Sequence, residues 1–444
     1  MTVTRFAPSP TGRLHIGNIR TALHCWLWAK KHGGRFLLRI DDTDAERSRE
    51  DYVDAIRTDL DWLGLARDGE ERQSARFALY EAQFEHLRAA GRVYACYETP
   101  EQLDLRRKVL LGRGLPPIYE RPDAQAPIPE ERAPHWRFRL DHAVAIEWDD
   151  LIRGSQHFDP KLISDPVVRR ADGSWLYLLP SVIDDIDMGV TTVVRGEDHV
   201  SNTATQLQMF AALGVEPPLF AHEALLVGAE GKLSKRLGSL DCDALRAGGI
   251  EPLAVAALLA RLGTSDSVEP VESFAPLIEG IDFSRFGRAP ARFDIAELET
   301  LNAKMLHQLP FDVVSARLPV GLSEAAWVVI RPNLSTIAEA NDWWRVVTGP
   351  IDVSSPTPED AAYLATAAGI AADLDWTAEP WHTLTTALKA RTERSGKALF
   401  MPLRLALTGR GHGPDMAALL PLIGREQALL RLGAAGAASA SDVA

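Results

Sequence analysis

Hydrophobic and polar residues follow different periods along the chain, and these periods predict its first elements. Residues 2–6 alternate like a short strand, residues 17–31 follow a helical period, and residues 35–40 form a short apolar run typical of a buried strand. An acidic loop and a second helical stretch at residues 45–63 come next. This order of strand, turn, helix, strand and helix predicts the beginning of a parallel α/β sheet.

The middle of the chain is irregular and rich in proline before it becomes periodic again. Residues 136–140 and 143–148 alternate as antiparallel strands do, so we expect an α+β insertion in the first domain. Residues 181–194 return to strand character and residues 202–213 to a helix. Residues 225–238 are expected to form a strand that leads into a lysine-rich loop.

Nearly all periodic segments beyond about residue 245 are helical and are separated by proline-containing breaks. The last dozen residues lack large side chains and are expected to be frayed. The predicted fold is therefore α/β: a Rossmann-type domain built on a parallel sheet, interrupted by an α+β insertion and followed by all-α domains.

Composition limits the class of protein. The chain has 444 residues, 46% of them hydrophobic, which excludes a disordered protein and predicts two to four domains. Lys and Arg number 48 against 61 Asp and Glu, a formal net charge of −13. A net negative charge argues against a protein coated in basic side chains, but it averages over all faces. One local basic surface still suffices for binding a nucleic acid.

The three cysteines, Cys25, Cys96 and Cys242, are widely spaced and form neither a disulfide framework nor a C-x-x-C pair. This usage is typical of a reducing compartment. We find no secretory signal at the N-terminus and no apolar stretch of roughly 18–20 residues, the length that a membrane span requires. We therefore expect a cytoplasmic protein that does not enter a membrane.

The turn after the first strand has features of an anion-binding site. Its sequence, PSPTGRLHIGN, places a helix N-terminus at the carboxyl end of a parallel strand, where backbone N–H groups bind phosphates. Gly12 and Gly17 allow a ligand to approach the backbone closely, and His15 can face the same crevice. Taken alone, this short motif is also explained by a helix N-cap behind a proline-stiffened turn.

A second candidate lies in the sequence GKLSKRLGS at residues 231–239. Lys232 and Lys235 are three residues apart in a loop flanked by glycines, so both can reach one phosphate chain. Compact ammonium charges suit triphosphate binding and stabilisation of a leaving group. A solvated surface loop is the alternative for this segment alone.

Together the two motifs resemble the paired HIGH and KMSKS signatures of class I aminoacyl-tRNA synthetases. The blocks RFAPSPTGRLHIGNIRTAL, LLRIDDTDAERS, YLLPSVIDDIDMGVTTVVRGEDHVSNT, GKLSKRLGS and APARFDIAELETLNAKMLH occur in the same order as in bacterial glutamyl-tRNA synthetases. The resemblance covers roughly residues 1–430. It implies an enzyme that attaches glutamate to tRNA through a glutamyl-adenylate.

The resemblance also implies roles for individual residues. His15, Lys232 and Lys235 are the expected catalytic residues. The expected ATP-binding residues are Pro8, Ser9, Thr11, Gly12, His15, Gly17, Asn18, Lys232, Ser234, Lys235 and Arg236. The expected glutamate-binding residues are Arg5, Ala7, Ser9, Asp41, Tyr177 and Arg195. Without the resemblance, Arg5 would read as a surface arginine at a strand end, Tyr177 as a core aromatic on a strand, and Arg195 as part of a salt bridge.

The glutamate site departs from the family pattern at two places. The family usually has Glu where this chain has Asp41, whose carboxylate is one methylene shorter. Around Tyr177 the family often reads PTYN, whereas this chain reads WLYL. We therefore expect amino-acid selectivity to be built differently in this chain.

The cofactors implied by the resemblance are ATP and Mg²⁺. Some members carry zinc in the inserted domain, bound by cysteines and a histidine. Only Cys96, followed by Glu98, stands there, and residues 119–127 have no Cys or His, so we expect no zinc. The implied partners are L-glutamate and tRNA-Glu, with tRNA-Gln as an open second substrate, and the expected oligomeric state is a monomer.

The implied domains are a Rossmann catalytic domain, an inserted acceptor-end-binding domain, a helical stem-contact domain, a helical anticodon-binding region and a disordered tail. Their expected boundaries are residues 1–85 with 181–240, 86–180, 241–310, 311–432 and 433–444, respectively. Candidate anticodon contacts, chosen for clustered positive charge, are Arg391, Arg394, Lys397, Arg404 and Arg410.

Four alternatives compete with this interpretation, and the first, a HIGH-type nucleotidyltransferase that does not act on tRNA, would be far shorter than this chain. Two DDxD clusters, at residues 41–44 and 184–187, are typical of isoprenoid synthases, but those enzymes are all-helical. A shortened paralogue that glutamylates a modified tRNA base lacks the helical C-terminal part. A catalytically inactive tRNA-binding relative stays open as the alternative that is not an enzyme.

Overall fold

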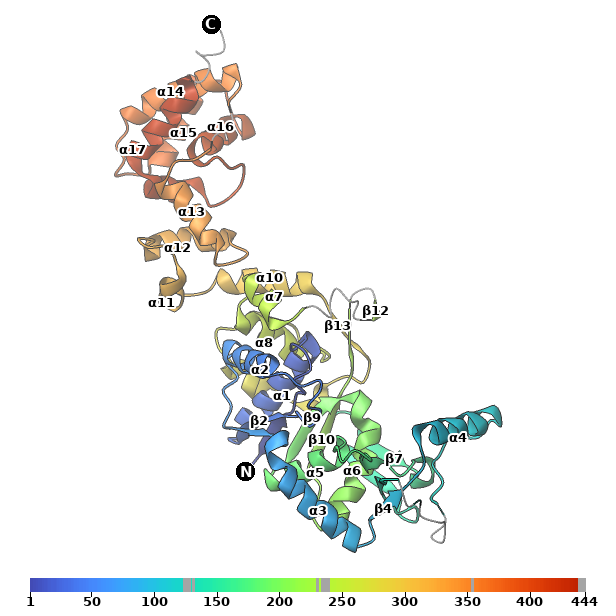
Figure 1. Cartoon of the computed structure of the whole chain (residues 1–444). Helices are drawn as coiled ribbons and strands as arrows, with labels where there is room; N and C mark the ends of the chain where they lie inside the picture. Colours follow the sequence, from blue (N-terminus) through green and yellow to red (C-terminus); the bar gives the residue numbers. More distant parts are fainter. Residues whose placement is uncertain (123–128, 130–131, 229–230, 233–239, 353–354, 438–444) are drawn as a thin grey trace. The chain divides into compact units, whose positions relative to one another are not determined.

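The computed structural model describes residues 1–122, 129, 132–228, 231–232, 240–352 and 355–437 (Figure 1). The chain forms two compact units. Unit 1 comprises residues 1–247 and 251–295, and unit 2 comprises residues 248–250 and 296–444.

Unit 1 is built on a seven-stranded sheet with the strand order β3-β2-β1-β9-β10-β6-β7. The strands are β1 (Val3–Phe6), β2 (Arg35–Ile40), β3 (Gly69–Arg72), β6 (Ile146–Asp150), β7 (Gly154–Phe158), β9 (Thr192–Gly196) and β10 (Leu219–Glu223). Each neighbouring pair is parallel except β6 and β7, which form an antiparallel hairpin at the edge. The expected Rossmann-type parallel sheet is confirmed.

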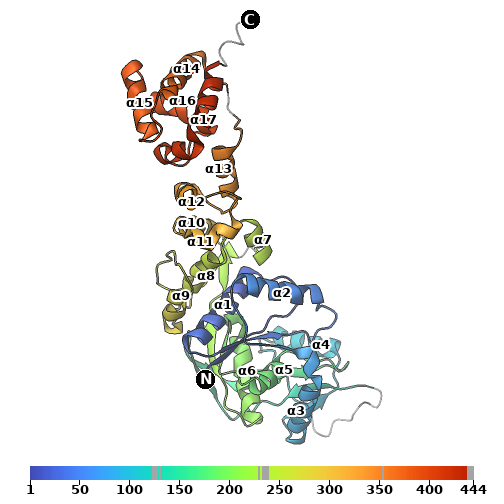
Figure 2. The same cartoon turned by 90° about the vertical axis from the view of Figure 1, so that its left-hand side faces the viewer.

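Strand order reverses between β1 and β9, because the chain moves from β1 to β2 and β3 in one direction and from β9 to β10 in the other. Helices α1 (Ile16–Lys31) and α2 (Glu50–Trp62) therefore cover one side of the sheet, while α5 (Leu178–Asp187) and α6 (Val200–Ala212) lie on the other (Figure 2). Ligands of open α/β sheets bind outside the carboxyl ends of the strands at such a switch point. Residues that follow β1 and β9 are therefore the first place to examine.

Several expected boundaries require correction. Residues 181–187 are helical, as part of α5, and only residues 192–196 of the expected strand form β9. Ser181, Asp184 and Asp185 recur at spacings of three and four residues and so share one face of α5, but all three are buried. The helix expected from residue 45 begins at Glu50.

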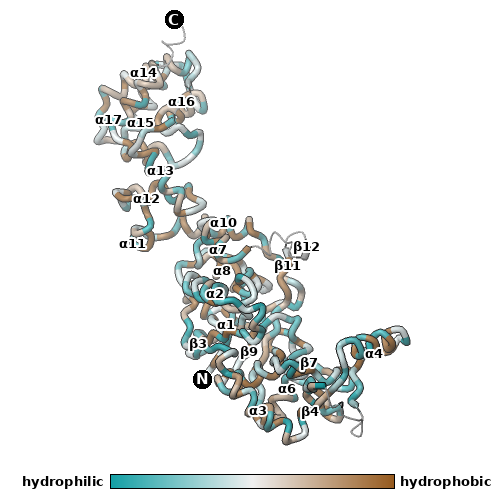
Figure 3. Tube along the Cα trace, viewed as in Figure 1, coloured by the Kyte–Doolittle hydropathy of each residue, from teal (hydrophilic) through white to brown (hydrophobic). Residues whose placement is uncertain are grey.

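The hairpin β6–β7 lies within residues 86–180, which the sequence assigns to the insertion, yet β6 pairs with β10 of the main sheet. The rest of the insertion carries its own antiparallel sheet of β4 (Val93–Cys96), β5 (His135–Phe138) and β8 (Val167–Arg169). Helices α3 (Phe77–Ala89) and α4 (Pro100–Gly112) flank these strands in the sequence. Hydrophobic and hydrophilic residues are mixed along α4, which has no buried residue (Figure 3).

The end of unit 1 holds a small sheet of β11 (Leu226–Gly228), β12 (Gly231–Lys232) and β13 (Ala291–Phe293). Helices α7 (Cys242–Ala247), α8 (Pro252–Arg261) and α9 (Ala275–Gly280) belong to the same unit. In α8 the residues from Ala254 to Ala260 are all buried, and α8 packs against α1.

Unit 2 is helical. Its helices are α10 (Ile295–Leu306), α11 (Phe311–Val314), α12 (Glu324–Ile330), α13 (Glu339–Thr348), α14 (Pro358–Ala372), α15 (Pro380–Arg391), α16 (Lys397–Thr408) and α17 (Met416–Ala437). Trp327 is fully buried in a core to which α12 to α17 contribute. Among the helices that the structure describes, none is long and apolar enough to cross a membrane.

The tail expected from residue 433 begins too early, because α17 continues to Ala437. Ala435 is buried, and a side chain at Gly436 would meet the backbone of Ala365 at 2.8 Å. Small residues therefore let α17 approach α14 closely, which stabilises a segment that lacks large side chains.

Candidate active site at the sheet switch point

The turn after β1 is fastened to the acidic loop that follows β2. The carbonyl oxygen of Pro8 accepts a hydrogen bond from the Asp41 backbone N–H at 3.0 Å, and that of Pro10 accepts one from Arg49 at 3.0 Å. Within the turn, the Thr11 N–H donates to the Ser9 carbonyl at 2.8 Å. These bonds present Ser9 and Thr11, both exposed, at the carboxyl edge of the sheet.

His15 is the N-cap of α1. Its Nδ1 accepts a hydrogen bond from the Gly17 backbone N–H at 3.1 Å, and its own N–H donates to Oδ1 of Asn18 at 3.3 Å. A ring that accepts at Nδ1 carries its proton on Nε2 when neutral, and the surrounding protein lowers the pKa of His15. The exposed side chain therefore offers an Nε2–H donor beside the helix N-terminus, where anions are favoured. The N-cap and the phosphate-binding interpretations are thus compatible.

The two signature motifs approach each other at the N-terminus of α1. The backbone of His15 forms an antiparallel bridge with Asp241, just after the lysine-rich loop, and Arg13 forms an ion pair with Asp243. The backbone of Lys232 lies in β12, paired with Val227 of β11. Ser234, Lys235 and Arg236 lie outside the described residues. The described residues on either side of them are Lys232 in β12 and Asp241 beside His15.

Arg5, near the end of β1, is buried and lies against an acidic residue of α5. Its Nε donates to Oδ1 of Asp185 at 3.0 Å. Arg39 of β2 donates to the same oxygen from Nη1 at 2.7 Å. Arg5 is therefore held by a buried network and is not a surface arginine.

Asp41 is held by the other side of Arg39. Arg39 donates from Nε to Oδ1 of Asp41 at 2.7 Å and from Nη2 to Oδ2 at 3.2 Å. Burial raises the pKa of Asp41 to about 6, against the opposing charge of Arg39. Asp41 therefore lies in the expected region, with both carboxylate oxygens bonded to Arg39. Ala7 lies between Phe6 and the Pro8 turn and is half-buried.

Arg195, on β9, is buried at the strand next to Arg5. Its Nη1 donates to the Tyr177 hydroxyl at 2.9 Å, so two residues expected in the glutamate site do meet. Its Nη2 donates to Gln206 at 2.7 Å, and its Nε to His222 at 3.3 Å. Burial lowers the pKa of Arg195, and the charge of Arg5 lowers it further. Tyr177 precedes α5 and is not on a strand.

Sequence reasoning assigned no role to several residues of this network, namely Arg39, Asp185, His199, Gln206 and His222. The His199 ring lies edge-on to the Tyr177 ring, with a centroid separation of 5.5 Å. Burial, with the charge of Arg195, lowers the pKa of His199 to about 4, so its ring is neutral beside two arginines. Asp185 lies in the DDID block and His199 in the RGEDH block of the sequence. Only the fold brings these two blocks together.

The DDxD alternative is rejected by the partners of its carboxylates. Asp184 accepts hydrogen bonds from Gln73 at 2.8 Å, Arg76 at 2.7 Å and Tyr80 at 2.8 Å. Asp185 is bonded to Arg5 and Arg39. Because these buried oxygens are already occupied by protein donors, they do not form a diphosphate-bound Mg²⁺ site.

The five candidate tRNA contacts of unit 2 fall into two groups. Arg394 forms ion pairs with Glu359, at 3.0 Å, and with Asp360. Arg404 donates to the Pro414 carbonyl at 2.7 Å, and Arg410 lies over the Trp343 ring at 4.7 Å. Arg391 and Lys397 are exposed. Arg394, Arg404 and Arg410 therefore stabilise the helical fold. Arg391 and Lys397, by contrast, have exposed side chains.

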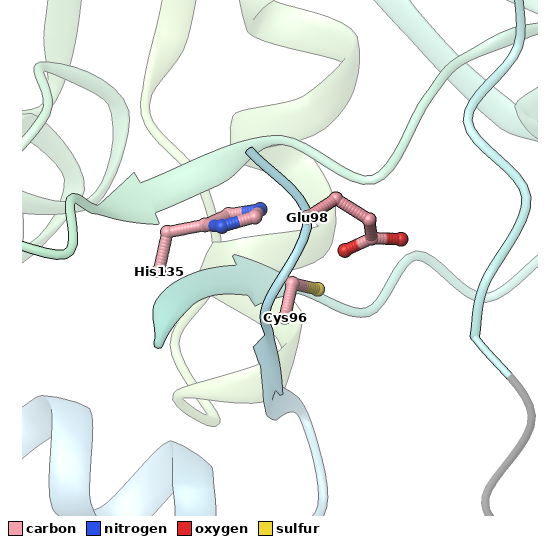
Figure 4. A group of neighbouring side chains, drawn as sticks. All are labelled: Cys96, Glu98 and His135. Carbon is pink, nitrogen blue, oxygen red and sulfur yellow. The ribbon is translucent and has the colours of Figure 1, made fainter. Parts of the chain in front are cut away.

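A separate group of donors lies in the inserted region, where Cys96, Glu98 and His135 converge (Figure 4). One ligand atom of each lies within 4.8 Å of the others. The premise that a three-ligand set cannot be assembled here is therefore wrong. His135 lies on β5, beyond residues 119–127, and the antiparallel pairing of β5 with β4 places it opposite Cys96.

Comparison with known proteins gives this geometry its context. Residues 1–300 match the family of tRNA synthetases class I (E and Q), catalytic domain, and residues 329–436 match an anticodon binding domain. The chain therefore belongs to the class I tRNA synthetases of the glutamate and glutamine group.

Individual relatives narrow this class. The chain is 70% identical to glutamate–tRNA ligase 2 of Sphingopyxis alaskensis, over 98% of this chain and all of the relative. It is 66% identical to glutamate–tRNA ligase 1 of Rhizorhabdus wittichii over 98% of its length and all of that relative. A crystal structure of a glutamate tRNA ligase from Elizabethkingia meningosepticum, in complex with its amino acid, matches with a TM-score of 0.83 and 27% identity, covering 98% of this chain and 99% of that one. Within the class, the chain belongs with the glutamate–tRNA ligases.

Proposed function

We propose that the protein attaches L-glutamate to the 2′-OH of the terminal adenosine of tRNA-Glu through a glutamyl-adenylate, releasing AMP and diphosphate. The observation that carries the proposal is the placement of Arg5 and Arg195 on adjacent strands at the switch point, next to the His15 turn. Two buried guanidinium groups favour a ligand with a carboxylate side chain. Asp41 and Tyr177 complete this pocket, and the names of the relatives support glutamate as its ligand.

The activation step joins two negatively charged reactants. The α-carboxylate of glutamate attacks the α-phosphorus of ATP, and pyrophosphate leaves. His15 donates its Nε2–H to the phosphates beside the N–H groups of α1, while Lys232 and Lys235 neutralise the leaving group. Mg²⁺, when bound together with ATP, would supply further neutralisation of phosphate charge. No side-chain nucleophile takes part.

The transfer step needs the tRNA end at the same crevice. We assign residues 86–180 to the acceptor end, residues 241–310 to the stem and residues 311–432 to the anticodon. The match of residues 329–436 to an anticodon binding domain supports the last assignment. The 2′-OH then attacks the mixed anhydride, and AMP leaves.

The decisive experiment is glutamylation of purified tRNA-Glu and tRNA-Gln by the full chain, with ATP consumption followed. We expect charging of tRNA-Glu and ATP–pyrophosphate exchange that depends on added tRNA. Charging of tRNA-Gln as well would show a non-discriminating enzyme. Absence of charging on both tRNAs would overturn the proposal in favour of an inactive tRNA-binding relative. Lys235→Ala should slow exchange by about 100-fold or more.

A further inference from the structure

Asp150, the last residue of β6, is a buried carboxylate whose two oxygens have separate partners. Its Oδ2 lies 2.5 Å from Nδ1 of His222, a residue of β10. Its Oδ1 accepts hydrogen bonds from three backbone N–H groups, those of Ile152 at 3.1 Å, Arg153 at 2.9 Å and His222 at 3.2 Å. Burial acts to raise the pKa of Asp150, but the hydrogen bonds from His222 and Arg153 hold that pKa below its usual range, so the carboxylate is ionised.

The His222 ring lies between a group that can only accept a hydrogen bond and a group that can only donate one. The ionised carboxylate of Asp150 has no proton to give, so Nδ1 of His222 carries the proton of that hydrogen bond. The guanidinium of Arg195 has no acceptor, and its Nε donates to Nε2 of His222 at 3.3 Å, so Nε2 carries no proton. Burial lowers the pKa of His222, and the charge of Arg195 lowers it further, as a neutral ring requires. Both neighbours therefore select the same tautomer, with the proton on Nδ1.

The hydroxyl group of Thr203 connects His222 to a second nitrogen of Arg195. Its Oγ1 accepts a hydrogen bond from Nη2 of Arg195 at 2.5 Å and lies 2.8 Å from Nε2 of His222. Because Oγ1 accepts from Arg195, the hydroxyl proton is available to the unprotonated Nε2. Nη2 also donates to Gln206 at 2.7 Å, and Nη1 donates to the Tyr177 hydroxyl at 2.9 Å. The orientation of the Arg195 guanidinium thus depends on an acceptor at Nε2 of His222.

We propose that Asp150 is a positioning residue for glutamate binding: it fixes the tautomer of His222, and His222 fixes the guanidinium of Arg195. This role rests on the proposed function, in which Arg195 binds the glutamate substrate. Asp150 lies within residues 86–180, which the sequence assigns to the acceptor end, but its contacts belong to the glutamate site. The pairing of β6 with β10 in the main sheet brings it there.

The turn that follows β6 is fastened to the same edge of the sheet by an ion pair. Nη1 of Arg153 donates to Oε2 of Glu197 at 2.6 Å, and Oε1 of Glu197 accepts from the Leu225 backbone N–H at 3.1 Å. Glu197 follows β9 directly, two residues after Arg195. The turn between β6 and β7 therefore supports the strand end that carries Arg195 at two points, through Asp150 and through Arg153.

Asp150→Asn tests this role with a side chain of nearly the same shape. The three backbone N–H groups at Oδ1 require an oxygen there, so the amide NH₂ of the new residue must face Nδ1 of His222. Nδ1 then accepts a hydrogen bond, the ring proton moves to Nε2, and two N–H groups point at each other between His222 and Arg195. The substitution thus imposes the wrong ring tautomer while it keeps the geometry of the Asp150 site.

The expected change in aminoacylation is confined to one substrate. Asp150→Asn should raise the KM for glutamate about tenfold or more, with kcat and the KM for ATP changed by less than about threefold. A mere loss of folded protein would lower the apparent kcat and leave the KM for glutamate unchanged. Asp165→Asn is the matched control, because Asp165 is a buried carboxylate of the same region whose partners are Arg121, Tyr94 and Leu140. It should keep the native KM for glutamate, and a native KM in Asp150→Asn would overturn the proposal.

The ring tautomer of His222 is a second readout, and it needs no substrate. Nitrogen NMR spectra of the full chain with isotope-labelled histidine should show a protonated Nδ1 and an unprotonated Nε2 for His222, and the reverse in Asp150→Asn. His222→Gln removes these signals and thereby assigns them. A protonated Nε2 in the native chain would overturn the proposal even if Asp150→Asn did not fold. Absence of tRNA-Glu charging by the native chain is a different result, which would overturn the proposed function itself.

Discussion

Asp185 fixes the orientation of Arg5 through a hydrogen bond of 3.0 Å between Oδ1 and Nε. The same oxygen accepts from Arg39 at 2.7 Å, and Arg39 in turn holds Asp41. One carboxylate of α5 therefore links two residues of the proposed glutamate pocket, Arg5 and Asp41. Asp185 acts through these residues as a positioning residue.

Asp185→Asn should raise the KM for glutamate about tenfold or more, equivalent to about 1.4 kcal/mol, and leave the KM for ATP nearly unchanged. The reason is that Arg5 and Arg39 lose the charge that orients them. Removing one partner of a buried ion pair also destabilises a fold by about 3–5 kcal/mol, so the melting temperature should fall. Steady-state aminoacylation with varied glutamate is the measurement.

Asp184→Asn is the matched control for that variant. Asp184 is equally buried and is bonded to Gln73, Arg76 and Tyr80; its Oδ2 lies 3.7 Å from Nε of Arg39, but it makes no hydrogen bond to Arg5. The variant Asp184→Asn should lower the melting temperature of the protein, with little change in the KM for glutamate. Equal KM values for the two variants would show that Asp185 has only a structural role.

His15 combines two roles that substitutions can separate. His15→Asn keeps an N-cap residue, because Asn caps helices well, but removes the Nε2–H donor. We expect ATP–pyrophosphate exchange to fall about 100-fold or more while thermal stability stays nearly unchanged. His15→Ala should lose the same activity and about 1 kcal/mol of stability as well. Full exchange activity in His15→Asn would show that His15 serves only as a cap.

The arrangement of the first strands and helices was predictable from sequence, because each element there has a clear period and is bounded by turn residues. The sequence interpretation missed the helix at residues 181–187, although Ser181, Asp184 and Asp185 recur at helical spacing. These polar residues are buried against partners from other elements, so α5 lacks the solvent-exposed polar face that marks a surface helix.

The position of His135 opposite Cys96 could not be predicted from the sequence either. The pattern of one strand shows which face is buried but not the register against its partner, and register decides which side chains stand opposite each other. The same reasoning applies to Arg5 and Asp185, which are far apart in the chain and meet only because α5 packs beside β1 and β2. By contrast, Tyr177 and Arg195, which the resemblance assigns to one site, are directly hydrogen-bonded to each other.

The shorter acid at position 41 should give glutamate binding a dependence on pH. Burial raises the pKa of Asp41 to about 6, so its negative charge, which would pair with the substrate ammonium, is lost as pH falls through that value. The KM for glutamate should rise roughly tenfold from pH 7 to pH 5, following the ionised fraction. Asp41→Asn should have a high KM without this limb, and a parallel limb in Asp41→Asn would assign the titration to another group.

The raised pKa of Asp41 affects folding in the opposite direction to glutamate binding: a rise in pH lowers the stability of the folded protein. Between the ordinary value of 3.8 and about 6, the folded protein retains a proton on Asp41 that the unfolded chain has released. The contribution of Asp41 to the free energy of unfolding therefore decreases as pH rises through this window. Denaturant unfolding of the native chain and Asp41→Asn at pH 4 to 7 should show a smaller decrease in the variant.

The five basic residues of unit 2 that we propose to bind tRNA differ in the exposure of their side chains. Arg391→Ala with Lys397→Ala should raise the KM for tRNA and reduce the slope of log K against log salt by about 0.7–0.9 for each phosphate that the variant no longer neutralises, without a change in melting temperature. Arg394→Ala should instead lower the melting temperature, because Arg394 is paired with Glu359 and Asp360 and lies over the Tyr363 ring at 4.5 Å. An unchanged salt slope in the double variant would exclude Arg391 and Lys397 from the tRNA-binding surface.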